Sequence, residues 1–454
     1  MKYELKEMSL SKVSVLTASC YSGSIYKHEA KKYKELYNYF IKELQPNTKT
    51  RREAIVWFVC TALQALRHDG SGFLVSFLAN NYTGNKHISY RGVKWVTDTL
   101  EEAGYIDIYY GFVSKWGVNK EVLETVSSLV KFKQPLLDVL GSVDIKKVPK
   151  LLLANCVEIR DRETKELKPL RGYKELEEIR GRVMKLNQKL SETKIVLDGN
   201  RMSSVQMKRV FADNLELGGR FYVVGGGVQT APKMLRYTSL FIDDKPVVEL
   251  DYKSMHPHIL LEKLNIHEYN GRLLEHLGEN FDPYATELYD LVRVDREKLE
   301  NHRKLLGNSK YDPVRTFKKK ALLVMLNAES LESAVGAMCQ ALAEDSKPSR
   351  NEMDRDFVGI CEGVKVKQAL LEIAEHNDVI KDFFFCDVAM GLMKIDSSIA
   401  DRVAEICMQA GHPVLIYHDS FIVKKSAEDL LYNAMQLAWK EEVGDNKFCK
   451  IERK

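Results

Sequence analysis

The sequence predicts a mixed α+β protein with more than one domain. Its 454 residues exceed the usual size of a single domain and favour two to four. Many segments place apolar residues at the helical period, whereas two short β-rich stretches, residues 247–251 and 414–423, lead into or surround polar residues. These patterns together predict many helices around a smaller number of strands.

The composition is that of an ordinary globular protein, with 45% hydrophobic and 29% charged residues. No apolar stretch approaches the ~20 residues that a membrane helix needs, and the first residues lack the apolar core of a signal peptide. The eight cysteines form no C-x-x-C pair, so neither a zinc site nor a disulfide framework is indicated. We therefore expect a cytoplasmic protein without membrane contact. The net charge of +4 is weak support for nucleic-acid binding, because local clusters matter more than the total.

Residues 1–135 predict a winged-helix-like domain. Residues 28–70 contain two helical patterns that end at Gly70, and Ser89 can cap a third helix that ends at Gly104. A β-rich stretch, "YIDIYYGF", follows, so the order is that of a winged helix-turn-helix. The apolar stripe of the third helix comprises Val93, Val96 and Leu100.

In a winged helix the third helix enters the major groove. Its exposed side would here present Arg91 and Lys94 as nucleic-acid contacts. Winged-helix folds also serve as protein-contact modules, so this alternative remains open.

Residues 136–214 are predicted to form a connector that contains one clear amphipathic helix, 172–193. The chain then changes to strand and turn patterns, so we place the main domain boundary before residue 215 and expect the last domain to span 215–454. The apolar face of the amphipathic helix comprises Leu176, Ile179, Val183, Leu186 and Leu190.

The stretch "VVELDYKSMHPHILLEKL" ends a buried-looking strand on Asp251 and continues as a helix. A carboxylate at this place either holds a metal ion or caps the helix. Glu249 shares a strand face with Asp251 and is a candidate third acidic ligand, and its alternative is a pairing with a nearby Lys or Arg.

A basic helix face is predicted within "VRTFKKKALLVMLNAES". Arg315, Lys319, Leu323 and Asn327 recur every four residues and therefore share one face. An arginine and a lysine one turn apart are suited to grip a triphosphate, although a basic face is more often simply solvated.

The segment "GHPVLIYHDSFIVKKS" predicts a β-hairpin with His418, Asp419 and Ser420 at its bend. Such residues are common in turns, but a second strand-end aspartate beside Asp251 has a chemical use. Two aspartates on adjacent strands can hold two divalent ions ~3.5–4 Å apart, the arrangement for in-line phosphoryl transfer.

These motifs, in this order, resemble the palm and fingers of the family A DNA polymerases and the related single-subunit RNA polymerases of the phage type. "DYKSMHP" resembles motif A (D-Y-S-Q-I-E), R-x3-K-x3-L-x3-N-A resembles motif B (R-x3-K-x3-F-x3-Y-G), and "HDS" resembles motif C. A fourth segment, "GRFYVVGGGVQTAP", keeps the family's G-R-x8-Q-x-x-P spacing ahead of motif A. The resemblance covers about residues 215–440.

The resemblance implies a right-hand polymerase, with an antiparallel-sheet palm and helical fingers in 215–454 and thumb-like helices in 136–214. It implies catalysis with two Mg²⁺ ions, for which Mn²⁺ is the alternative. Asp251 and Asp419 would be the metal ligands, helped by the Tyr252 carbonyl, and His418 would lie near the primer terminus. The implied nucleotide contacts are Arg315, Lys319, Leu323, Asn327 and His256. The implied primer–template contacts are Arg220, Gln229 and Arg236.

The sequence also departs from the family pattern. Asn327 and Ala328 stand where the family has Tyr-Gly, and Leu323 replaces an aromatic residue. His256 stands where the DNA polymerases have a Glu that excludes the ribose 2′-hydroxyl. Its bulk favours deoxynucleotides, whereas an imidazole nitrogen that accepts a hydrogen bond from the 2′-hydroxyl would favour ribonucleotides. No D-x-E exonuclease motif precedes the palm, so proofreading is not expected.

The sequence thus predicts a template-dependent DNA polymerase whose partners are primer–template DNA, deoxynucleotides and other replication proteins. Such an arrangement suits a phage or mobile element by association. One alternative is a primase or single-subunit RNA polymerase, which "HDS" favours and His256 disfavours. The other is a DNA-binding replication initiator whose palm is only structural.

Overall fold

A computed structural model describes most of the chain after residue 32. The helix stop expected at Gly70 and the Pro232 of the fourth motif lie outside the described residues. Buried apolar side chains form two separate clusters, one between Leu36 and Leu140 and the other between Cys156 and Cys449. The described ranges are 33–67, 71–75, 77, 89–111, 113–116, 122–125, 128–145, 156–202, 205–224, 228–229, 231, 233–288, 291–306, 308–345 and 364–454.

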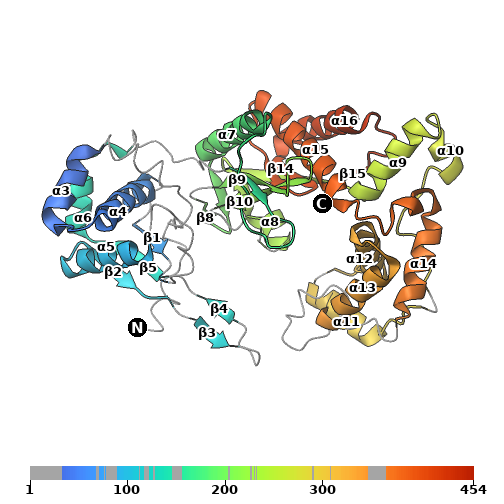
Figure 1. The fold of residues 1–454 in the computed structure, drawn as a ribbon, viewed down its shortest axis with the longest axis horizontal. Helices are drawn as coiled ribbons and strands as arrows, with labels where there is room; N and C mark the ends of the chain where they lie inside the picture. The colour runs from blue at the N-terminus through green and yellow to red at the C-terminus, as the bar shows by residue number, and fades with distance from the viewer. Residues whose placement is uncertain are drawn as a thin grey trace.

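The N-terminal unit packs its helices on a small antiparallel sheet of order β1-β5-β2 (Figure 1). A separate hairpin, β3–β4, lies in sequence between β2 and β5. Its helices are α3 (Lys34–Leu44), α4 (Lys49–Arg67), α5 (Tyr90–Glu102) and α6 (Gln134–Leu140). Its strands are β1 (Gly72–Val75), β2 (Ile106–Tyr109), β3 (Val113–Trp116), β4 (Val122–Thr125) and β5 (Ser128–Phe132).

The capped helix predicted after Ser89 is confirmed as α5. The Ser89 hydroxyl accepts a hydrogen bond from the Gly92 backbone N–H at 3.1 Å, which satisfies one of the free donors of the first turn. Gly104 follows the helix with a φ of 77°, a left-handed conformation that glycine adopts without a steric penalty. The predicted apolar stripe, Val93, Val96 and Leu100, is fully buried.

The C-terminal unit contains two further sheets. The smaller has the order β10-β9-β6, in which β6 runs parallel to β9 and the other pair is antiparallel. The larger has the order β13-β14-β12-β11-β7-β8, and β15 also pairs with β12. The strands are β6 (Val157–Arg160), β7 (Ile195–Leu197), β8 (Asn200–Arg201), β9 (Gln206–Ala212), β10 (Gly218–Val224), β11 (Leu240–Ile242), β12 (Lys245–Tyr252), β13 (Leu415–Tyr417), β14 (Ser420–Lys424) and β15 (Ile451–Arg453).

The helices of this unit cover the sheets and extend to one side of them, where α11, α12, α13 and α14 lie together (Figure 1). In the described part of the chain, no helix has the length and hydropathy required to cross a membrane. The helices are α7 (Leu176–Glu192), α8 (Lys233–Ser239), α9 (Met255–His267), α10 (Leu273–Leu277), α11 (Arg296–Leu306), α12 (Pro313–Asn327), α13 (Leu331–Asp345), α14 (Val366–His376), α15 (Ala389–Gln409) and α16 (Glu428–Val443), with short 3₁₀ helices η6 (Asp378–Phe383) and η7 (Lys425–Ala427).

The structure corrects the domain boundary predicted before residue 215. That position lies between β9 and β10, which pair along their length, so a boundary there would cut through a sheet. Because buried side chains from Cys156 onward belong to the same cluster as those of β12 and β14, residues 156–214 are part of the C-terminal unit. Similarly, α6 buries Leu136 and Leu140 in the N-terminal cluster, so that unit extends beyond residue 135.

The helix expected as a thumb-like element lies against this unit. The apolar face predicted for 172–193 is buried in α7, as expected. The Asn187 side chain bonds the backbone of Met207 in β9 through both its amide atoms, at 2.7 and 2.9 Å. These two buried bonds fix α7 to the smaller sheet.

Candidate active site

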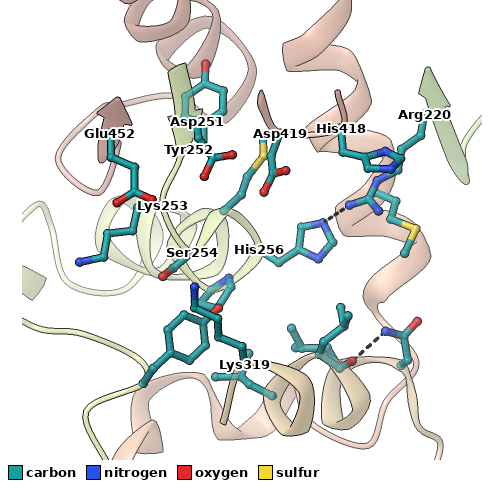
Figure 2. A pocket seen from close by; sticks show the side chains of 18 of the residues that line it. Arg220, Asp251, Tyr252, Lys253, Ser254, His256, Lys319, His418, Asp419 and Glu452 are labelled. Atoms are coloured by element: carbon teal, nitrogen blue, oxygen red, sulfur yellow. Dashed lines mark hydrogen bonds between the residues drawn. The ribbon is translucent and has the colours of Figure 1, made fainter. Parts of the chain in front are cut away.

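The two strand-end aspartates lie side by side because β12 pairs with the β13–β14 hairpin. In the register Asp251 is opposite Ser420, and the backbone N–H of Tyr252 donates to the carbonyl of Asp419 at 3.1 Å. Asp251 lies in β12, whereas Asp419 lies in the turn of the adjacent β13–β14 hairpin, so the two carboxylates are neighbours as expected although Asp419 is not itself a strand residue. Figure 2 shows both carboxylates directed into the same space.

The hairpin turn explains the position of His418 and Asp419. These two residues connect Tyr417 to Ser420, and His418 adopts a φ of 59°. Two-residue hairpin loops favour turn types I′ and II′, because the twist of these turns matches that of the flanking strands. Both types require a positive φ at the first turn residue. The turn therefore presents the next side chain, Asp419, at the end of the sheet.

A cavity of about 360 Å³ opens beside this strand end, facing α12. This volume is at the lower end of the range for small-molecule sites. Most of the expected site residues meet there, although they come from four separate segments of the chain. Those lining the cavity are Arg220, Asp251, Tyr252, His256, Lys319, Leu323, Asn327, His418 and Asp419.

Asp251 is held by a hydroxyl and an ammonium group. The Ser420 hydroxyl donates to one carboxylate oxygen at 2.5 Å, and Lys454 forms an ion pair with the other. Lys454 also pairs with Glu452, which lies opposite Asp251 in the β12–β15 register. The residue that precedes α9 is Ser254, so the helix-cap role considered for Asp251 is wrong.

Asp419 has an unusual electrostatic environment. Its burial and the nearby Asp251 carboxylate raise the pKa of Asp419 to about 6. Two carboxylates that repel each other in a buried place gain from a cation between them.

The donor set fits magnesium. The available atoms are the oxygens of Asp251, Asp419 and the Tyr252 carbonyl, and Mg²⁺ binds through one or two carboxylates together with water and substrate phosphates. The ammonium of Lys454, held between Asp251 and Glu452, shows that a cation is already favourable here. Within the described ranges, no group of three or more His, Cys, Asp and Glu side chains is arranged around a metal position.

The opposite wall of the cavity is the face of α12. Asp312 caps this helix by accepting from the backbone N–H groups of Val314 and Arg315, and Pro313 follows at the first turn. All four residues of the expected face lie in this single helix, and three of them, Lys319, Leu323 and Asn327, line the cavity. Burial and then the nearby positive charges of Arg315 and Lys454 lower the pKa of Lys319.

Arg315 is already engaged within the chain. Its guanidinium pairs with Asp282 at 2.8 Å and lies 5.3 Å from the ring centroid of Tyr284, and it does not line the cavity. Lys319 is therefore the cation that α12 directs into the cavity.

Two of the three expected primer–template contacts have their polar groups occupied by the protein. The Gln229 amide accepts from the Val223 N–H at 2.8 Å and donates to the Phe221 carbonyl at 3.3 Å. Arg236 is only 4% exposed and lies 3.5 Å from Glu249. The structure therefore corrects the expected nucleic-acid contact of Arg236, because a buried and paired guanidinium cannot reach a phosphate.

The same contact decides between the two roles considered for Glu249. Its carboxylate is 5% exposed and paired with Arg236, so the alternative of a pairing with a basic residue is confirmed. Glu249 is not a third acidic ligand. The acidic side chain that does line the cavity beside Asp251 is Glu452.

Arg220, the third of these residues, lies between two cavities. A second cavity, of about 470 Å³, shares Arg220 and Met393 with the first and therefore adjoins it. Its basic lining residues are Arg160, Arg162, Lys165, Lys208 and Arg220.

In the N-terminal unit, Arg91 is exposed on α5. Lys94 is half-buried, pairs with Asp98 at 2.5 Å and donates to the Tyr110 hydroxyl at 3.1 Å. Arg91 is thus open to a ligand, whereas the charge of Lys94 is neutralised by its own helix.

Sequence reasoning missed four residues at the site: Tyr284, Asp396, Glu452 and Lys454. One of them carried a signal, because Asp396 lies within the apolar stripe of α15 between Leu392 and Ala400, where a polar residue needs a reason. The others lie in segments without a motif.

No family model matches the chain, and no curated protein matches it significantly.

Proposed function

We propose that this protein is a template-dependent DNA polymerase that adds deoxynucleotides to a 3′-hydroxyl by two-metal phosphoryl transfer, without proofreading. One observation carries the proposal. Three motifs from separate parts of the chain meet around one cavity, with Asp251 and Asp419 on the strand side and Lys319 on the helix side. A paired carboxylate site opposite a cation is the arrangement that a metal-bound nucleoside triphosphate requires.

The residues have separate tasks in this reaction. Asp251, Asp419 and the Tyr252 carbonyl would hold the metal ions, while Ser420 fixes the Asp251 carboxylate. Lys319 binds the triphosphate from the opposite wall and offsets its charge. Two Mg²⁺ ions, when bound, would supply the Lewis acidity that activates the 3′-hydroxyl and neutralises the leaving pyrophosphate.

The adjoining cavity supports a path for the nucleic acid. Its lining has five basic side chains and one acidic one, Asp161, an excess of positive charge that suits the phosphates of a strand whose end reaches the first cavity. Four of the five, all but Lys165, also pair with carboxylates of the chain and would have to exchange these for phosphates. His418, which lines the first cavity, lies against Tyr222, which lines the second, with ring centroids 5.9 Å apart. This position supports a contact of His418 with the primer terminus.

For the N-terminal unit we propose a winged-helix contact with DNA. The support is its topology, with α5 preceding β2 and the β3–β4 hairpin inserted before β5. Arg91→Ala should weaken DNA binding and reduce the salt slope by about one, because one phosphate contact is lost. Lys94→Ala should change it less, and equal slopes for all three proteins would favour a protein-contact module.

The function is tested by primer extension on a primed DNA template with dNTPs or rNTPs, each with and without Mg²⁺. Mg²⁺-dependent extension that prefers dNTPs supports the proposal. A preference for rNTPs, or synthesis without a primer, would favour the primase or RNA polymerase alternative. Tight DNA binding with no extension under any of these conditions would favour the replication initiator.

A further inference from the structure

A buried polar network lies behind His256. The Nε2 atom of His256 is 2.8 Å from a carboxylate oxygen of Asp396, and the Arg220 guanidinium pairs with the same oxygen at 2.5 Å. His256 is 8% exposed and Asp396 5%. The three residues come from α9, α15 and β10, and the phosphoryl-transfer chemistry proposed above has no task for Asp396.

The contacts define which ring nitrogen carries a proton. A carboxylate only accepts hydrogen bonds and a guanidinium only donates them. The 2.8 Å contact with Asp396 therefore requires a proton on Nε2, and Arg220, 3.3 Å from Nε2, donates to Asp396 instead. In the neutral ring Nδ1 is then the unprotonated nitrogen. Figure 2 shows the ring between Asp419 and α12, with one nitrogen toward Arg220.

Asp396 is itself held in place, because α15 is fixed to β10. The adjacent Ser397 hydroxyl donates to the Gly218 carbonyl at 2.9 Å, and the buried Arg209 bridges the Gly219 carbonyl and Asp401 at 2.8 Å each. A Cβ on Gly219 would lie 2.8 Å from the Ser397 hydroxyl and 2.6 Å from Phe211. This close approach requires a glycine, which explains one residue of the G-R segment.

We propose that Asp396 is a positioning residue that sets sugar selectivity by holding the His256 imidazole as a rigid wall of the nucleotide cavity. This inference rests on the proposed function: the incoming nucleotide would occupy the cavity that His256 lines, with its sugar against that ring. A ring that can rotate away would admit a 2′-hydroxyl, whereas a ring tied to Asp396 cannot move. Asp396 does not touch the nucleotide and acts through His256.

The test compares the ratio of kcat/KM for dNTPs to kcat/KM for rNTPs in three variants. Asp396→Ala should lower this ratio by about tenfold, within the range for one poorly excluded hydroxyl. Asp396→Asn should largely keep it, because the amide oxygen still accepts from Nε2. Arg402→Ala is the control, since Arg402 is a residue of α15 whose ion pairs, with Glu405 and Glu441, involve neither β10 nor His256. An equal fall in Asp396→Ala and Arg402→Ala would overturn the inference.

A double-mutant cycle and a spectroscopic measurement complete the test. In a His256→Ala background, Asp396→Ala should no longer change the ratio, and an undiminished effect there would show that Asp396 does not act through His256. The ¹⁵N shifts of the His256 ring in the wild-type protein should show a protonated Nε2, and a ring protonated only on Nδ1 would contradict the geometry. Absence of turnover with both nucleotide classes would defeat the proposed function, whereas turnover with an unchanged ratio would defeat this inference alone.

Discussion

The two walls of the cavity are built in different ways. The strand wall carries Asp251 and Asp419, whose positions are fixed by backbone pairing between β12 and β14 and by side-chain partners. The helix wall carries Lys319 on one face of α12, where the side chain is accessible from the cavity although the surrounding groups partly desolvate it. One wall is a set of paired groups, and the other presents a lysine that forms no ion pair within the described part of the chain.

Under the proposed function, this difference separates the groups that would hold the metal ions from the one that would follow the substrate. Rigid carboxylates suit metal ions, because a precise geometry must be ready before the substrate arrives. An exposed lysine suits a triphosphate, because a flexible point charge follows the phosphates as they move. Substitutions in the strand wall should therefore affect turnover most, and those in the helix wall should affect nucleotide use.

The largest effect is expected at the strand wall. Asp251→Ala and Asp419→Ala should each reduce primer extension by several orders of magnitude, because either change leaves the carboxylate pair incomplete. DNA binding, measured by fluorescence anisotropy, should remain nearly unchanged. Asp429→Ala, at an exposed aspartate of α16, serves as the control. If either variant keeps more than about a tenth of the wild-type turnover, this site assignment is wrong. A tenfold loss corresponds to only ~1.4 kcal/mol of activation free energy.

The helix wall should give a smaller and more selective effect. Lys319→Ala should lower kcat/KM for the nucleotide by roughly ten- to a hundredfold, as expected for one lost charge-assisted contact, with little change in primer–template binding. Lys318→Ala and Lys320→Ala are matched controls, since neither residue lines the cavity. Steady-state kinetics with varied dNTP would reveal the difference, and equal losses at all three lysines would contradict the helix register.

The packing that supports the strand wall should make the fold sensitive to acid. Burial, and then the charges of Lys450 and Lys253, lower the pKa of His258 in α9 to about 4. Below about pH 6.5 the unfolded chain binds a proton there that the folded protein does not, so stability falls as the pH decreases toward 4. Between pH 7 and 4.5 this amounts to roughly 2 kcal/mol.

His258→Leu should remove that loss, whereas His267→Leu, at the exposed end of the same helix, should not. Urea unfolding at several pH values measures both. Asp419 acts with the opposite sign in this range, because its raised pKa makes the folded state keep a proton that the unfolded chain releases. The difference in the free energy of unfolding between His258→Leu and the wild type, followed over pH, isolates the contribution of His258. A difference that does not change with pH would show that His258 does not titrate in this way.

The smallest effect should come from the internal cation of the strand wall. Lys454 pairs with Asp251, so a metal ion must compete with its ammonium. Lys454→Ala should therefore tighten Mn²⁺ binding, measured by electron paramagnetic resonance, by a few-fold, in line with the modest strength of a partly exposed ion pair. Lys447→Ala is the control, because Lys447 is an exposed lysine of the same C-terminal segment that does not line the cavity and whose hydrogen bond in the described structure is to the Gly271 backbone carbonyl. Weaker Mn²⁺ binding after Lys454→Ala would mean that the ammonium supports the site rather than occupying it.

The sequence by itself determined the features that depend on local physics. The period of apolar residues in α7, the Ser89 cap of α5 and the four-residue spacing along α12 are set by backbone geometry within a few turns. The β13–β14 hairpin also follows from neighbouring residues, because its turn has only two. The candidate residues Asp251, Asp419 and Lys319 could be selected from such segments.

Only the tertiary structure decided which partner each of these side chains has. Three such pairings join segments that lie far apart in the chain. The segment around β15 brings Glu452 and Lys454 beside Asp251, Arg236 is buried against Glu249, and Asp396 faces His256. No short-range pattern encodes such pairings, because a strand register or a helix–sheet contact is selected by the packing of the whole core. For the same reason the domain boundary was misplaced: a turn pattern before β10 is visible in the sequence, whereas the hydrogen bonds that join β10 to β9 exist only in the folded chain.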